Sequence, residues 1–173
     1  MKITTLCYIT HGDKWLLLHR ISKKNDENAG KWIGVGGKAE EGESPEECLI
    51  REVREETGLN VAESYRLRGI VTFVSDEYGT EYMFLYSVRN PAGQADILSC
   101  TEGRLEWIRD CDMERLPMWE GDRIFLRLIR QDHPFFSLKL CYCGEKLCRA
   151  VLDGTELDLC ENSENNHNNP NVF

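Results

Sequence analysis

The sequence predicts one domain that combines β-strands with two helices. Its 173 residues suit a single domain, because domains usually contain ~100 to 200 residues. Several segments rich in apolar, β-branched and aromatic residues are separated by turn residues, which is typical of strands. Two segments, 45–57 and 119–130, instead carry apolar residues at helical spacing.

The chain is expected to begin with a hairpin. Residues 4–9 are an alternating strand pattern, and a compact apolar run within 14–20 follows the turn at 11–13. The polar residues 22–31 predict a loop, and 32–35 a short strand. Closely spaced glycines then indicate a tight loop that leads into the first helix.

The ends of the first helix are marked by local signals. Ser44 is the predicted N-cap, and Pro45 stands where its missing N–H costs nothing. Glu47, three residues after Ser44, completes a capping box. Gly58 is expected to end the helix after Thr57.

The second half of the chain contains further predicted strands at residues 65–75, 80–89, 105–108, 136–142 and 147–152. An amphipathic helix is expected over 119–130. Residues 161–173 have too little apolar surface to offset the entropy of ordering, which predicts a disordered tail. We therefore expect a folded domain over 1–160.

The composition excludes several classes of function. A net charge of −9 argues against a general duplex-binding surface. No apolar stretch approaches the ~20 residues of a membrane span, and the first residues lack a signal-peptide pattern. The prediction is a cytoplasmic protein that binds neither duplex nucleic acid nor membrane. Its eight cysteines are expected to be reduced, small apolar fillers.

Three glutamates within the first helix stand out. Glu52, Glu55 and Glu56 occupy positions i, i+3 and i+4, so they project from one helix face within one turn. Three carboxylates repel one another unless a cation offsets their charge, and a hard cation such as Mg²⁺ or Mn²⁺ prefers oxygen ligands. The alternative interpretation is a solvated acidic helix face.

The context of these glutamates favours the metal. After Gly37 come five residues and Glu43, then seven residues and Arg51-Glu52-Val53-Arg54-Glu55-Glu56-Thr57-Gly58-Leu59. This 23-residue pattern fills every fixed position of the Nudix box, and the chain strongly resembles a Nudix hydrolase. The resemblance implies an α/β fold, an α/β/α sandwich with a mixed β-sheet. It also implies hydrolysis of a nucleoside diphosphate linked to another group.

The resemblance implies a metal site as well. Glu52, Glu55 and Glu56 would bind Mg²⁺, with Mn²⁺ as a substitute, assisted by the backbone carbonyl of Gly36. Glu102 lies where related enzymes carry a downstream metal-binding or base-like glutamate. A solvated loop carboxylate is the alternative for Glu102.

Catalytic roles follow from the same motif. Glu43 and Arg51 match positions that pair and hold the loop on the helix, so Arg51 is counted with the catalytic residues; a simple surface ion pair is the alternative. Glu55 and Glu102 both remain candidates for the general base, and Glu52 is not excluded, because proton transfer depends on distances that a sequence does not give.

Beyond the box, the chain is similar to MutT-type diphosphatases that hydrolyse oxidised purine nucleoside triphosphates. The shared segments are 30–38, 119–122 and 134–137. This similarity implies 8-oxo-dGTP as the preferred substrate. One departure concerns Ile33, where some oxidised-purine enzymes place an asparagine that reads the base; Ile33 can pack against a ring but cannot read its edge.

The similarity also implies where the base binds. Trp119 would stack on the purine while Asp122 hydrogen-bonds its edge, and Glu120 is a weaker candidate for substrate contact. Alternatively, Trp119 caps a core helix and Asp122 is a solvent-facing acid in its first turn. Both interpretations are open at this point.

Phosphate contacts and partners complete the expectations. Arg20 and Lys38 are the preferred candidates to grip the triphosphate, ahead of Lys23 and Lys24, although surface lysines are more commonly solvated. The expected partner is a small nucleotide, and the oligomeric state cannot be read. A different nucleotide substrate, or a catalytically silent nucleotide-binding regulator, are the alternative functions.

A second metal site is not expected at the cysteines near the end of the domain. Cys141, Cys143 and Cys148 lack a paired Cys-x-x-Cys knuckle, so zinc there is disfavoured.

Overall fold

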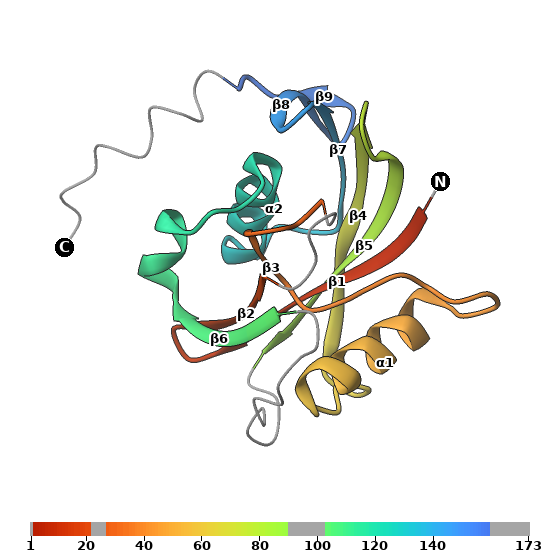
Figure 1. Cartoon of the computed structure of the whole chain (residues 1–173), viewed down its shortest axis with the longest axis vertical. Coiled ribbons are helices and arrows are strands. Elements are labelled where there is room, and N and C mark those ends of the chain that lie inside the picture. The colour runs from red at the N-terminus through yellow and green to blue at the C-terminus, as the bar shows by residue number, and fades with distance from the viewer. Residues whose placement is uncertain (1, 22–26, 90–102, 160–173) are drawn as a thin grey trace.

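A computed structural model describes residues 2–21, 27–89 and 103–159. In this part of the chain the strands form one mixed sheet (Figure 1), with the order β3-β2-β1-β5-β4-β7-β8-β9 and β6 paired with β2. The strands are β1 Lys2–His11, β2 Lys14–Arg20, β3 Trp32–Ile33, β4 Tyr65–Ser75, β5 Gly79–Arg89, β6 Gly103–Arg109, β7 Phe136–Cys143, β8 Lys146–Leu152 and β9 Thr155–Glu156. The pairs β1–β5 and β4–β7 are parallel, and the other pairs are antiparallel.

Each face of the sheet is covered by one helix, as Figure 1 shows. Helix α1, Pro45–Thr57, buries Leu49 and Val53 in a core with residues of β1 and β5. Helix α2, Glu120–Arg130, buries Phe125 in a second core with residues of β1, β4, β5 and β7. Burying about 25 cal/mol per Å² of apolar surface on both faces stabilises the layers. The expected α/β/α sandwich is confirmed.

Helix α1 begins and ends where its sequence signals predict. Ser44 accepts a hydrogen bond from the backbone N–H of Glu47, and the Glu47 carboxylate accepts one from the Ser44 N–H at 2.8 Å. Gly58 has a φ of 74°, a left-handed conformation that glycine adopts without strain, and its N–H bonds the Arg54 carbonyl. The helix that carries the acidic residues therefore has a fixed start and end.

Strand β1 separates from β2 midway along its length. The two pair only near their turn, from Ile9 and Leu16 to His11 and Lys14. Farther along β1, the segment after β3 takes the place of β2 beside it, through bridges at Cys7–Val35 and Thr4–Lys38. The expected strand 32–35 is consequently shorter, because it leaves β2 after Ile33 and joins β1 at Val35.

Other differences arise from contacts between distant segments. A 3₁₀ helix, Asp110–Arg115, was not predicted; Asp110 is held by a backbone bond to Asp13 at 2.8 Å and an ion pair with Arg130 at 2.7 Å. Strand β9 was not predicted either.

The cysteines are less uniform than the sequence suggested. The six described cysteines are free, which agrees with the prediction of reduced thiols. Cys7 and Cys48 are buried, whereas Cys111, Cys143 and Cys148 are exposed, so the expectation of apolar fillers is wrong for these three. Their solvent exposure depends on which side of a strand (Cys143, Cys148) or of the 3₁₀ helix (Cys111) each residue occupies, and residue type does not specify this.

Two further expectations concern the C-terminal tail and membrane-spanning helices. The tail 161–173 lies outside them, so its disorder stays a prediction. Among the described helices, neither length nor apolar character suffices for any to cross a membrane.

Candidate active site

The loop before α1 is fastened to the edge of β1. Four backbone hydrogen bonds join them. Cys7 and Val35 exchange two, at 2.7 and 3.0 Å, the Thr5 N–H donates to the Gly37 carbonyl at 2.9 Å, and the Ala39 N–H donates to the Ile3 carbonyl at 3.0 Å. A Cβ on Gly36 would collide with the Thr5 carbonyl, so only glycine permits this approach. The sheet thereby sets the position of the loop.

Arg51 ties this loop to α1. Its Nε and Nη2 donate to the two carboxylate oxygens of Glu43 at 2.8 and 2.9 Å, and Nη2 also donates to the Lys38 carbonyl at 3.3 Å. The bidentate bonds from Arg51 lower the pKa of Glu43 to about 2. The expected Glu43–Arg51 pair that holds the loop on the helix is confirmed.

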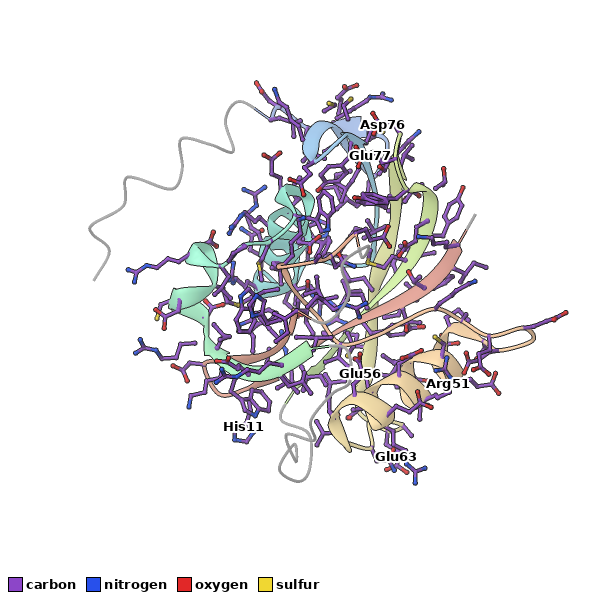
Figure 2. All side chains as sticks on the ribbon, in the orientation of Figure 1. His11, Arg51, Glu56, Glu63, Asp76 and Glu77 are labelled. Atoms are coloured by element: carbon purple, nitrogen blue, oxygen red, sulfur yellow. The ribbon has the colours of Figure 1, made fainter. Side chains whose placement is uncertain are left out.

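The three glutamates of α1 lie beside this loop but in different surroundings. Glu56 is buried, and its Oε2 accepts a hydrogen bond from the Gly36 N–H at 3.1 Å. The Glu52 carboxylate lies against Gly37, where an added Cβ would be 2.5 Å from its Cδ. The Glu55 side chain is 61% exposed. Figure 2 shows Arg51 and Glu56 on α1, below the sheet.

These carboxylates fit a divalent cation chemically. Oxygen donors on a rigid helix, next to a backbone turn held open by Gly36 and Gly37, suit Mg²⁺ or Mn²⁺. Arg51 Nη1 contacts Glu52 Oε1 at 2.6 Å and Glu55 Oε2 at 3.4 Å, so a guanidinium offsets part of their repulsion. Across residues 2–21, 27–89 and 103–159, no three acidic, His or Cys side chains converge around one point to enclose a metal, the cysteines of β7 and β8 included.

A cavity of about 620 Å³ adjoins this motif. Eight of the predicted site residues line it: Arg20, Ile33, Gly36, Lys38, Arg51, Glu52, Trp119 and Asp122. Glu55 and Glu56 are outside its lining. Glu102 lies outside the described residues, as do Lys23 and Lys24, so their roles stay predictions.

Trp119 closes one end of the cavity. It immediately precedes α2, is 5% exposed, and its indole Nε1 donates to the Asn28 side-chain oxygen at 2.9 Å. The Lys31 ammonium lies 4.2 Å from the centre of its ring, and Phe73 contacts it edge-on at 5.8 Å. Trp119 thus both belongs to the core and lines the cavity. Sequence patterns gave no signal for Asn28, Lys31 or Phe73.

Asp122 lies in the same end of the cavity and is buried. Its exposure is only 7%, so the alternative of a solvent-facing acid is wrong. The first turn of α2 packs against β7, where the Gly121 N–H donates to the Tyr142 hydroxyl at 2.7 Å. Burial raises the pKa of Asp122 to about 8, against the opposing effects of Arg123 and Lys31, so the acid is mostly neutral at pH 7.

The structure places Glu120 away from the cavity. Its Oε2 accepts a hydrogen bond from the Leu147 N–H at 3.1 Å, which joins α2 to β8. Glu120 is absent from the lining, so the expected contact with substrate is not supported and a structural role fits the residue better.

Comparison with known proteins now decides the family. A family model described as the NUDIX domain matches residues 2–129. The chain belongs to the Nudix family. It is therefore a pyrophosphohydrolase, and Nudix hydrolases generally use divalent metal ions.

Relatives of this Nudix hydrolase include a bacterial and a vertebrate protein. An uncharacterized Nudix hydrolase of Bacillus subtilis, YvcI, is 35% identical over 121 residues, which are 68% of this chain and 72% of YvcI. The oxidized purine nucleoside triphosphate hydrolase of Danio rerio is 30% identical over 140 residues, 79% of this chain and 84% of that protein.

Solved structures agree with the fold. The crystal structure of a mutator MutT protein from Bacillus halodurans has a TM-score of 0.76 and 28% identity, and the match covers 88% of this chain and 98% of that one. The NUDIX domain of Shewanella oneidensis NrtR, solved with ADP ribose, has a TM-score of 0.65 at 21% identity, covering 76% of this chain and 88% of that one. At that identity the second likeness concerns the fold alone.

The buried acid of this Nudix hydrolase predicts a pH-dependent stability. Asp122 loses its proton near its ordinary pKa of 3.8 in the unfolded chain but near 8 in the folded protein. Between these values the folded protein binds more protons at this group, so the free energy of unfolding decreases as pH rises through the window. We expect Asp122→Asn to remove this decrease. This effect is measured as the difference in melting temperature between wild type and variant from pH 5 to 8. A difference that does not change with pH contradicts a raised pKa of Asp122.

Proposed function

We propose that this Nudix hydrolase converts oxidised purine nucleoside triphosphates to monophosphates and pyrophosphate with Mg²⁺, and that 8-oxo-dGTP is its preferred substrate. Its role would be to remove such nucleotides from the cytoplasmic pool before they enter DNA. The observation that carries the proposal is one cavity that is lined both by Trp119 and Asp122, at an end where Phe73 contacts Trp119, and by Glu52 and Gly37, which lie against each other at the loop before α1. The resemblance to the Danio rerio enzyme supports the same substrate class.

The Trp119 end suits a purine with both donors and acceptors on its edge. Trp119, Phe73 and Ile33 supply apolar and aromatic surface for a ring. A neutral Asp122 can donate one hydrogen bond through its O–H and accept another through its carbonyl oxygen, unlike an ionised carboxylate, which only accepts. Oxidation at C8 of guanine turns N7 from an acceptor into an N–H donor, and such a carboxyl group can match the changed pattern.

The opposite end suits phosphates. Lys38 belongs to the loop that is bridged to Thr4, and Arg20 also lines the cavity, so both can bind phosphate oxygens. The metal would be held by Glu52, Glu55 and Glu56, where it would neutralise charge on the phosphate oxygens and lower the pKa of an attacking water. Arg51 keeps the loop and helix together through Glu43, and so fixes the distance between the phosphate-binding loop and the carboxylates.

A substrate panel tests this proposal. Values of kcat/KM are measured with Mg²⁺ for 8-oxo-dGTP, dGTP, other nucleoside triphosphates, ADP-ribose and a dinucleoside polyphosphate, with EDTA as the control. We expect 8-oxo-dGTP to give the highest value, and pyrophosphate release to stop with EDTA. A higher value for ADP-ribose or a dinucleoside polyphosphate contradicts the substrate, and binding without hydrolysis of any compound indicates a silent regulator.

A further inference from the structure

The cavity contains a carboxyl group that none of the preceding roles explains. Glu81 on β5 lines the cavity and is partly buried. Its Oε1 accepts a hydrogen bond from the Thr4 hydroxyl at 2.6 Å, while in the described part of the chain its Oε2 makes no hydrogen bond. Because Oε2 is not among the fully buried unpaired atoms, it remains accessible. An acceptor oxygen is therefore available at the cavity.

The charges around Glu81 come from two neighbouring segments. Burial is the main influence and raises the pKa of Glu81, while the Thr4 hydrogen bond lowers it. Glu27 raises this pKa further and Lys2 lowers it, and these two residues form an ion pair at 3.3 Å. Removing a carboxyl group partly from water is costly, and a hydrogen-bond donor on a ligand would offset that cost.

The position of Glu81 indicates which part of a ligand it meets. Across the sheet, Glu81 pairs with Phe73 of β4, whose ring contacts Trp119 at the base end. On its other side, its hydrogen-bond partner Thr4 is bridged to Lys38 of the phosphate-binding loop. Glu81 thus lies between the two ends of the cavity. In a nucleotide, the sugar occupies that position between base and phosphates.

We propose that Glu81 is a specificity-determining residue that accepts a hydrogen bond from a sugar hydroxyl of the nucleotide. The inference rests on the proposed function to the extent that the cavity binds a nucleoside phosphate. Carboxylates accept strongly from hydroxyl groups, and a buried acceptor without its donor costs binding energy. The site therefore discriminates against nucleotides that lack the hydroxyl, independently of the base they carry.

A series of sugars on one base and one triphosphate tests this role. Ribonucleotide, 2′-deoxynucleotide and 2′,3′-dideoxynucleotide are compared by kcat/KM, with the base that the enzyme hydrolyses best. For the wild-type enzyme, we expect kcat/KM to fall about 10- to 100-fold between the two nucleotides that differ by the contacted hydroxyl. Because the proposed substrate is a 2′-deoxynucleotide, we expect the loss at the second step, which removes the 3′-hydroxyl. A loss at the first step, which removes the 2′-hydroxyl, would support the role of Glu81 but contradict a deoxynucleotide as the preferred substrate.

Two variants separate recognition from stability. In Glu81→Met the new side chain is similar in length but has no oxygen acceptor. Because the contact is gone, we expect the kcat/KM ratio between the nucleotides with and without the hydroxyl to fall below about threefold. Glu81→Gln keeps one amide oxygen and should retain part of the step. Glu77→Met, at the exposed β4–β5 turn (Figure 2), is the matched control and should keep the wild-type ratios.

The outcomes distinguish this inference from the proposed function. Dissociation constants for the same sugar series, measured by calorimetry, give the discrimination without turnover. If another base proves to be preferred, the proposal of 8-oxo-dGTP as substrate fails, but the sugar series on that base still tests the role of Glu81. Equal values for all three sugars in wild type, or an unchanged step in a folded Glu81→Met protein, overturns the role of Glu81.

Discussion

Glu56→Gln is expected to lower kcat by about a thousandfold while the protein stays folded. The amide keeps an oxygen that can accept the hydrogen bond from the Gly36 N–H, now at 3.1 Å, so the buried side chain still fits its site. It loses the negative charge that a divalent cation requires. Steady-state hydrolysis, Mn²⁺ affinity by titration and thermal unfolding of the variant together measure the effect.

Glu63→Gln is the matched control for this substitution. Glu63 is exposed, beyond the end of α1 (Figure 2), and does not line the cavity. The same change of charge there should leave kcat and Mn²⁺ affinity unaltered. Wild-type turnover in folded Glu56→Gln would remove Glu56 from the metal site, and equal losses in both variants would indicate a general effect of net charge.

Gly37→Ala is expected to reduce kcat/KM by about a hundredfold, with little change in stability. The added Cβ would lie 2.5 Å from Cδ of Glu52, so the carboxylate must move away from the loop. The backbone of Gly37 does not have a positive φ, so alanine can adopt its conformation. Activity and melting temperature of the purified variant test whether the place of Glu52 beside the loop matters.

Gly42→Ala provides the comparison for Gly37→Ala. No atom lies within 4 Å of a Cβ at Gly42, although its φ of 81° makes alanine strained there. We therefore expect Gly42→Ala to lower the melting temperature more than the activity, the reverse of Gly37→Ala. Unchanged kcat/KM in Gly37→Ala would show that Glu52 does not need its observed position.

Local signals account for the parts of this structure that the sequence predicts well. The capping box of Ser44 and Glu47 and the left-handed Gly58 act within a few residues, so α1 could be placed with its ends. The Nudix box is also a continuous segment, and the match to it predicted the Glu43–Arg51 pair. In both cases the interacting groups are close in sequence.

The cavity was harder to predict because the sheet assembles it from distant segments. Glu81 meets Thr4 only through the parallel pairing of β5 with β1, and Lys31 reaches Trp119 from a loop far earlier in the chain. The burial of Asp122 depends on how α2 packs against β7, whereas an acid in a first helical turn is ordinarily solvated. Sequence periodicity does not predict these contacts, because they join residues that are far apart in the chain.

The proposed reaction requires that the glutamates of α1 hold the catalytic cation. Crystals grown with Mn²⁺ and a slowly hydrolysed nucleotide triphosphate, measured at a wavelength where manganese scatters anomalously, locate the ion directly. We expect anomalous peaks within coordination distance of Glu52 and Glu56 oxygens and of the nucleotide phosphates. Peaks bound to phosphate elsewhere in the cavity, with both carboxylates uncoordinated, would contradict it.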